Sequence, residues 1–407
     1  MNRTRKIFVP DAASLPKTAD VVVVGGGIVG VATAFWLSRA GLDTVLVEMR
    51  EGLSTLTTPL SVESFRAQMT ESAMADLVLP SIRMYENFAE TVGIPGHDIA
   101  LKHQGYLFVS DDAAMAEKLR QAVAVHHSHG VTGSEFVDAD AIRRRFPYIS
   151  ERMVCGTFHQ NDGWLSSHEA TQGFAKGSRA KFLLQTRVTG IGTDAAGVAA
   201  VHTSRGSIAT RHVVNAAGPF AQSIAQMVGV TLPVDAVRRQ KVHVAPKPQI
   251  PRSAPLCIDI GAETYWRPEH GGALMAWVDP DEPVTANPLE DVPTDWDYAA
   301  VLLDKITALS PFWAEVAETL SASDLTTTAG YYMYTPDDQP LIGPVDAVNG
   351  FHLNCGYWAG VMLSPEAGRR VSCLVTGEMR PEDNPLRPSR FAEGLVTTGD
   401  SFLRGRH

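Results

Sequence analysis

The sequence predicts an α/β fold made of two intertwined domains, and three observations support this prediction. The chain has 407 residues, more than one simple hydrophobic core usually holds. Apolar residues make up 44% of it and charged residues 20%, which is typical of globular and not of disordered proteins. Residues 20–48 read as strand, glycine-rich turn, helix and second strand, the unit from which parallel sheets are built.

This first unit is predicted in four pieces. They are a buried strand, a turn, a helix with a glycine C-cap and a second strand, at residues 21–24, 25–30, 31–40 (then Gly41) and 43–48. Residues 21–37 carry no charge over 17 positions, a pattern that a membrane segment would also show. Three consecutive glycines would weaken a helix there. We therefore expect strand, turn and helix, and no membrane span.

The rest of the chain alternates helical and strand-like patterns without repeats. Helices are predicted at residues 72–92, 113–129, 139–147, 297–319 and 364–376. Strands are predicted at residues 105–110, within 183–214, at 213–220 and within 237–280.

Charge and cysteine usage exclude some classes of protein. The formal net charge of −10 argues against a nucleic-acid partner, because phosphate binding needs clustered Lys and Arg. The four cysteines form no C-x-x-C pair, so we expect neither a disulfide framework nor a zinc site. Reduced thiols and the lack of a signal-peptide core favour a cytoplasmic protein.

The histidines offer no convincing site. His126, His127 and His129 stand at a polar helix end, where we expect a solvated surface and no metal. His159 and His168 flank NDGWLSS and could reach an active site, but a structural role is the default expectation.

The glycine-rich turn has the features of a dinucleotide site. Gly25 permits the tight turn, Gly27 lets the backbone approach a pyrophosphate, and Gly30 lets the helix pack against the strand. Glu48 ends the second strand, where its carboxylate can accept both hydroxyls of an adenosine ribose and would repel the 2′-phosphate of NADP. Strand, turn, helix and acid stand in register, which favours a nucleotide site over a ligand-free turn.

Four segments together make the chain similar to the D-amino-acid-oxidase-like family of FAD-dependent oxidoreductases. They are the glycine motif with Glu48, GYLFVSDD (105–112), VVNAAGPFA (213–221), and AGYYMYTPDDQPLIGP (329–344) with NCGYWAGVMLSPEAG (354–368). The resemblance implies a glutathione-reductase-type, Rossmann-like FAD-binding domain interleaved with an α+β substrate domain on a mixed sheet. The FAD-binding domain would comprise residues 19–90, 150–225 and 330–380, and the substrate domain residues 91–149 and 226–329, with terminal extensions 1–18 and 381–407.

The resemblance also implies which residues bind FAD. Val188 resembles the position that meets the adenine, Ala217 and Gly218 a second approach to the pyrophosphate, and the loop 355–362 the amides that face the flavin. The expected cofactor-binding residues are Gly25, Gly27, Ile28, Val29, Gly30, Glu48, Met49, Thr57, Val188, Ala217, Gly218, Gly356, Ala359, Gly360, Val361 and Met362. Ordinary tight turns are the alternative for the NAAG and CGYWAG segments.

For the substrate, the family chemistry implies oxidation of a neutral amine by hydride transfer to flavin N5, followed by imine hydrolysis. Arg66 resembles the arginine that binds substrate carboxylate in sarcosine oxidase, and its planar fork suits bidentate binding. Arg267 is the second candidate, and a structural salt bridge is the alternative for both. The other candidate catalytic residues are Tyr332, Tyr357, Trp358 and Met275. Rings in this region could hold an alkylated amine by cation–π attraction or could belong to the core.

The chain also departs from its relatives. The lysine that helps sarcosine oxidase hold the carboxylate falls at Met362, and glycine oxidase's arginines are unmatched at Tyr332 and near Ala359. Tyr332 also aligns with the cysteine that attaches FAD in monomeric sarcosine oxidase, so FAD is expected to be non-covalent. Met275 falls where sarcosine oxidase has a lysine linked to oxygen activation, which favours a dehydrogenase or a poor oxidase.

The leading hypothesis is thus oxidation of a small secondary or tertiary amine, an N-substituted amino acid. A 2-hydroxy acid dehydrogenase is the first alternative, although it would want a histidine base, which the C-terminal flavin loop lacks. An FAD-binding subunit that acts only within a heteromeric dehydrogenase is the second. The electron acceptor and the oligomeric state stay open.

Overall fold

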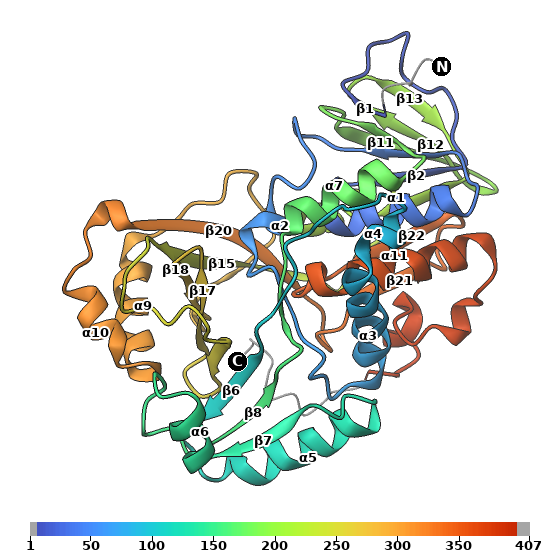
Figure 1. Ribbon diagram of the computed structural model, residues 1–407. Coiled ribbons are helices and arrows are strands. Elements are labelled where there is room, and N and C mark those ends of the chain that lie inside the picture. The colour runs from blue at the N-terminus through green and yellow to red at the C-terminus, as the bar shows by residue number, and fades with distance from the viewer. Residues whose placement is uncertain (1–5, 397–407) are drawn as a thin grey trace.

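The computed structural model describes residues 6–396. Residues 1–5 and 397–407, which belong to the two predicted terminal extensions, lie outside the described part. Figure 1 shows two sheets in separate regions of the molecule, with chain segments passing repeatedly between them. The expected α/β fold with mixed sheets is confirmed.

The first sheet has seven strands in the order β1-β10-β3-β2-β14-β22-β21. Their bounds are Ile7–Phe8, Lys181–Leu183, Thr44–Val47, Val21–Val24, His212–Asn215, Phe351–Cys355 and Leu341–Pro344. All neighbours pair in parallel except β21 and β22. β2 and β3 are buried throughout, as their unbroken apolar runs require for a sheet covered on both faces.

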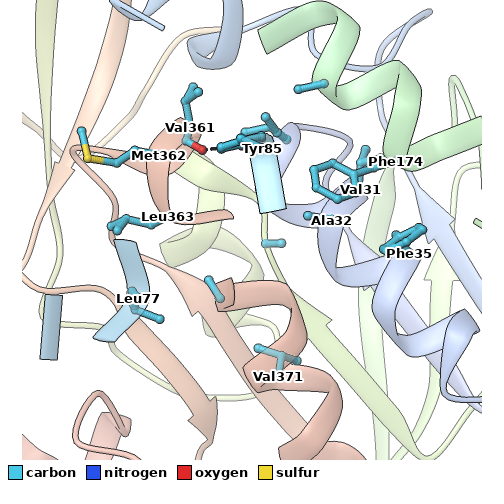
Figure 2. Packing of buried hydrophobic residues seen from close by; sticks show 14 of the residues in the cluster. Val31, Ala32, Phe35, Leu77, Tyr85, Phe174, Val361, Met362, Leu363 and Val371 are labelled. Atoms are coloured by element: carbon cyan, nitrogen blue, oxygen red, sulfur yellow. Dashed lines mark hydrogen bonds between the residues drawn. The ribbon is translucent and has the colours of Figure 1, made fainter. Parts of the chain in front are cut away.

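Helices cover one face of this sheet. They are α1 (Ile28–Arg39), α3 (Ser72–Glu86), α7 (Ser167–Gly177) and α11 (Gly360–Thr376). Figure 2 shows their packing, in which the Tyr85 hydroxyl donates to the carbonyl oxygen of Val361 at 2.6 Å. The apolar cluster on the other side of the sheet includes residues of a three-stranded sheet, β11 (Val188–Asp194), β12 (Gly197–Thr203) and β13 (Gly206–Ala209).

The second, mixed sheet follows the order β19-β15-β18-β17-β16-β6-β8-β7, and β20 pairs with β15. Their bounds are Val284–Thr285, Asp235–Val244, Gly272–Trp277, Thr264–Glu269, Leu256–Asp259, Tyr106–Ser110, Cys155–His159, Glu135–Asp138 and, for β20, Leu325–Tyr334. One face packs against α9 (Trp296–Leu309) and α10 (Phe312–Ala317). Helix α5 (Met115–Ser128) and the shorter helix α6 (Ala139–Arg145) lie beside β7 and β8.

Three predicted helices have different bounds in the structure. The helix expected at residues 72–92 is broken at Asn87 into α3 and α4 (Phe88–Val92). The helix expected at 297–319 ends before Pro311, which lacks the N–H that would continue it. α11 starts at Gly360, four residues earlier than expected. The sequence predicts a later start because a glycine at this position is typical of a loop. Within residues 6–396, no helix has the length and apolarity needed to cross a membrane.

Candidate active site

A cavity of about 420 Å³ opens where β2, β3 and β14 end. We call it the cofactor cavity. Its walls include most of the predicted cofactor-binding residues, namely Gly25, Gly27, Ile28, Val29, Glu48, Met49, Thr57, Val188, Ala217, Gly218, Gly356, Gly360 and Val361. A crevice at the carboxyl ends of parallel strands is the usual ligand site of such sheets.

The glycine turn has the predicted geometry. Gly25 has φ +110°, and a Cβ there would lie 2.4 Å from the carbonyl oxygen of Ala216. A Cβ on Gly30 would lie 2.0 Å from the carbonyl oxygen of Gly25, so Gly30 serves helix–strand packing and is not part of the cavity wall. Gly27 precedes α1, whose first turn faces the cavity without an acidic side chain. This arrangement leaves helix N-terminal amides available to phosphate.

Two polar side chains fit the adenosine and phosphate parts of FAD. The Glu48 carboxylate accepts hydrogen bonds from the backbone N–H groups of Gly26 and Arg50, at 2.6 and 2.8 Å. Burial raises its pKa. Ser54 lines the cavity, and its buried hydroxyl has no hydrogen-bond partner within the described chain. Since buried polar groups are normally paired, Ser54 indicates a polar ligand, and the cavity fits FAD.

The far end of the cofactor cavity is formed by the loop before α11. Gly356 has φ +79°, a conformation that favours glycine. The N-terminus of α11 has no side-chain cap at Ala359, so its first backbone amides are free. These amides and the positive end of the helix dipole lie at this end of the cofactor cavity. Such a terminus can stabilise negative charge on a bound flavin ring.

A second cavity, of about 150 Å³, adjoins the first. We call it the substrate-side cavity. It is lined by aromatic rings, by one arginine and by four acidic residues, namely Tyr106, Phe108, Tyr265, Tyr332, Tyr334, Trp358, Arg66, Glu63, Asp259, Glu263 and Asp338. Five residues line both cavities: Ser61, Tyr332, Trp358, Gly360 and Val361. Ala359 and Met362, predicted to bind the cofactor, line the substrate-side cavity alone, whereas Tyr357 lines the cofactor cavity alone.

Arg66 is a buried cation in the wall of the substrate-side cavity. Its guanidinium lies 5.4 Å from the centre of the Phe108 ring and 5.6 Å from that of Trp358. Nη1 donates to the carbonyl oxygen of Gln68. No carboxylate of residues 6–396 forms an ion pair with Arg66, and burial lowers its pKa. Glu71 and Asp162 favour the charged form of Arg66 from beyond ion-pair distance. A buried cation without a direct ion pair is costly, which indicates an anionic ligand.

A hydrogen-bonded network behind Arg66 was not predicted. The Gln68 amide donates to the Asp162 carboxylate at 3.0 Å and accepts from the Thr157 hydroxyl at 2.8 Å. Asp162 also accepts from the backbone N–H of Ala67 at 2.6 Å and pairs with His159 at 2.8 Å. The network fixes the backbone on which Arg66 stands and gives His159 its structural role.

Arg267 and Met275 lie outside the substrate-side cavity, contrary to their prediction as catalytic residues. Arg267 is 1% exposed, and its charge is matched by Glu269 at 2.8 Å. Met275 is fully buried with Trp266 and Val242 in the core beneath α9. Because Met275 points to that core, its identity does not report on the charge next to the flavin.

The predicted solvated histidine surface is wrong for His126. This residue is fully buried, and its Nδ1 lies 2.9 Å from the Ser134 hydroxyl. Burial lowers its pKa to about 3. His127 is exposed, as expected, although its Nε2 lies 2.7 Å from the carbonyl oxygen of Ser134. The helix end therefore packs on the loop that follows it, which the polar sequence did not show.

Residues 286–295, which connect β19 to α9 and which we call the arm, cross to the adenosine end of the cofactor cavity. Glu290 accepts a hydrogen bond from Arg187 at 2.5 Å, and its carbonyl oxygen accepts from Arg50 at 3.3 Å. The backbone N–H of Leu289 donates to the Tyr331 hydroxyl at 3.3 Å. Arg187 and Tyr331 both line the cavity, so the arm tethers its wall.

Comparisons with known proteins agree with this geometry. The chain is 24% identical over 404 residues to the mitochondrial dimethylglycine dehydrogenase of Rattus norvegicus, covering 93% of this chain and 45% of that protein. It is 26% identical over 399 residues to the mitochondrial sarcosine dehydrogenase of Homo sapiens, covering 94% and 42%. The chain thus spans less than half the length of these relatives.

Among solved structures, L-proline dehydrogenase from P. horikoshii superimposes with a TM-score of 0.81 at 26% identity, covering 93% of this chain and 99% of that one. The model of the DAO family, FAD dependent oxidoreductases, matches residues 20–374. The chain therefore belongs to the DAO family of FAD dependent oxidoreductases, with FAD as its cofactor.

Proposed function

We propose that this protein oxidises a small secondary or tertiary amine that carries a carboxylate, an N-substituted amino acid. The observation that carries the proposal is Arg66, a buried guanidinium that lines the substrate-side cavity and forms no ion pair with a carboxylate of the described chain. A planar guanidinium binds a carboxylate in bidentate fashion. Rings on both sides leave room for an apolar or alkylated amine.

The named relatives support this substrate class. Dimethylglycine, sarcosine and L-proline all join a carboxylate to a substituted amine, and the matching proteins are named for their dehydrogenation. The identities of 24–26% do not carry one substrate over to this chain. Met362 in the cavity wall, where sarcosine oxidase has a lysine, makes sarcosine itself a weaker candidate than a larger N-substituted amino acid.

In this proposal the chain's own residues orient the substrate. FAD, when bound, supplies the hydride acceptor. Arg66 binds the substrate carboxylate, Trp358 and Tyr332 hold the carbon next to nitrogen beside the cofactor cavity, and the α11 N-terminus stabilises negative charge there. The substrate reacts as the neutral amine, so no protein base is required.

The 2-hydroxy acid alternative receives less support from the cavity walls. Removing a hydroxyl proton calls for a general base such as histidine. No histidine of the described chain lines either cavity. The heteromeric-subunit alternative is separate, because the same cavities would serve within a larger assembly.

Anaerobic bleaching of the flavin absorbance tests the proposal. The panel contains sarcosine, dimethylglycine, L-proline, an opine, an N-alkyl amine without carboxylate, and 2-hydroxy acids. We expect carboxylated secondary or tertiary amines to bleach the flavin and the amine without carboxylate to fail. Bleaching by hydroxy acids alone would reverse the assignment. If no compound bleaches the flavin, gel filtration of the chain expressed alone would test the subunit alternative.

The flavin is proposed to be non-covalent, because Tyr332 stands where monomeric sarcosine oxidase has its attaching cysteine. Acid precipitation of the holoenzyme should then leave the yellow colour in the supernatant. Colour that stays with the protein pellet would contradict this.

A further inference from the structure

A buried lysine lies beneath the chain segment that joins the two cavities. Lys241 stands on β15 next to Val242, which belongs to the core under α9. Because side chains alternate along a strand, Lys241 points to the opposite face, toward the cavities. It is 4% exposed, and its Nζ donates to the carbonyl oxygens of Pro59 and Ser61 at 3.0 and 2.6 Å.

The segment that Lys241 holds contacts both cavities. The short helix α2 (Thr57–Leu60) packs on β20 at Gly330, where a Cβ would lie 3.3 Å from the Leu60 Cβ. On the cofactor side, the Thr58 hydroxyl accepts from the backbone N–H of Ile28, at the start of α1, at 3.2 Å. On the substrate side, the chain continues through Ser61 to Arg66.

Arg267 binds the next carbonyl of the same segment. Its Nη2 and Nε donate to the carbonyl oxygen of Val62 at 3.2 and 3.3 Å. Two cations on the mixed sheet thus bind three carbonyls within four residues, those of Pro59, Ser61 and Val62. Buried carbonyls need donors, and charged donors give the stronger hydrogen bonds.

The charges around Lys241 are mixed. Glu63, next to the held segment, and Glu269 on β17 favour the ammonium form, whereas Arg267 opposes it. His243, two residues along β15, pairs with Glu269 at 2.8 Å. Burial is the largest effect and lowers the pKa of Lys241 to about 8. Mild alkali should therefore remove this charge.

We propose that Lys241 is a positioning residue, which holds residues 57–62 so that the cofactor side at Thr58 and the substrate side at Arg66 keep their relative placement. The role rests on the proposed function only in taking the substrate-side cavity as a carboxylate site. In this role the mixed sheet not only lines a cavity but also positions the segment that connects the two cavities. No sequence motif around Lys241 predicts this role.

The test compares Lys241→Met and Lys241→Arg with the wild-type holoenzyme. Acetate is the carboxylate probe, and its dissociation constant is measured from the flavin difference spectrum, together with the dissociation constant of FAD. Lys247→Met is the matched control, because Lys247 also donates to a carbonyl oxygen, that of Thr319, but Thr319 lines neither cavity.

We expect Lys241→Met to weaken both acetate and FAD binding by about tenfold, as loss of charge-assisted hydrogen bonds predicts. Lys241→Arg should recover most of this, and Lys247→Met should resemble the wild type. Wild-type affinity for acetate should fall above pH 8, while Lys241→Arg stays level to pH 10, since acetate itself does not titrate there.

Unchanged affinities in a folded Lys241→Met protein would overturn the proposal. So would an identical pH profile in wild type and Lys241→Arg, which is the decisive comparison if the methionine variant does not fold. Neither probe is oxidised. A holoenzyme that shows these shifts while no amine bleaches its flavin would refute the proposed function and leave the role of Lys241 standing.

Discussion

The guanidinium of Arg66 lies 5.6 Å from the centre of the Trp358 ring, and the indole N–H of Trp358 donates to the carbonyl oxygen of Asp338 at 2.8 Å. Trp358 therefore connects the buried cation to the turn that follows β20. Since Arg66 comes from the segment after α2 and Trp358 from the loop before α11, their contact joins two distant parts of the chain at the cavity wall.

Replacing Arg66 with alanine should weaken binding of acetate or of a substrate by about 10–100-fold, because a charged hydrogen-bond partner of the carboxylate is lost. FAD content should not change. Titration of the flavin spectrum with the ligand measures the effect. Arg143→Ala, at an exposed arginine on α6, is the control and should bind as the wild type does. Equal affinities in both variants would remove Arg66 from the site.

Trp358→Leu should weaken carboxylate binding by up to about 30-fold, since the ring that faces the Arg66 guanidinium disappears. Trp358→Phe keeps a ring and loses the hydrogen bond to Asp338, so it should lie closer to the wild type. The same titration ranks the three proteins. If leucine and phenylalanine are equally harmful, the hydrogen bond and not the ring determines the position of Arg66.

Glu290→Gln should raise the dissociation constant of FAD by up to about fivefold, which is modest because the pair with Arg187 is partly exposed. The difference should vanish in 1 M salt, which screens such pairs. Equilibrium dialysis of the holoenzyme gives the constants. Glu393→Gln, at an exposed pair with Arg387 away from the cofactor cavity, is the control. A salt-independent effect would indicate a steric and not an electrostatic role for the arm.

Acid should destabilise the fold through His352. Burial lowers the pKa of this histidine on β22 to about 4, from an ordinary value of 6.5. As the pH falls, His352 is protonated in the unfolded chain before it is protonated in the folded protein. Its contribution to the free energy of unfolding is therefore full above pH 6.5 and is lost as the pH falls toward 4. The loss reaches about 3 kcal/mol, at 1.36 kcal/mol per pKa unit. Thermal unfolding between pH 7 and 4 measures it.

His352→Gln removes the titrating group, so its unfolding midpoint should fall less steeply with acid than that of the wild type. His202→Gln, at an exposed histidine on β12, should keep the wild-type slope. Parallel curves for all three proteins would show that carboxylates, not His352, govern acid unfolding.

Most of the residues that the sequence predicts to bind the cofactor line one cavity, whereas only some of those predicted for the substrate side lie together. The Gly25–Gly30 turn and Glu48 could be identified because they are close in sequence and each has a local geometric reason. Arg267 and Met275 were misplaced because their strands, β17 and β18, are buried on both faces. Apolar alternation, which normally tells the cavity face from the core face, is absent there.

Other site residues depend on contacts between distant segments. Gln68 and Asp162 are 94 residues apart, and Lys241 and Ser61 are 180 apart. Sheet register and loop packing bring these pairs together, and no short motif encodes either. The buried environment of His126 was missed for the same reason, since a polar run at a helix end predicts solvent until the partner loop is known.

The wall shared by the two cavities makes the occupants thermodynamically dependent on each other. Bound flavin restricts the motion of Tyr332 and Trp358 from one side. A carboxylate that binds from the other side therefore loses less side-chain conformational entropy on binding. Linkage requires that the benefit be mutual, so a tightly bound carboxylate should lower the dissociation constant of FAD. Small anions in a purification buffer would then help the enzyme to stay yellow.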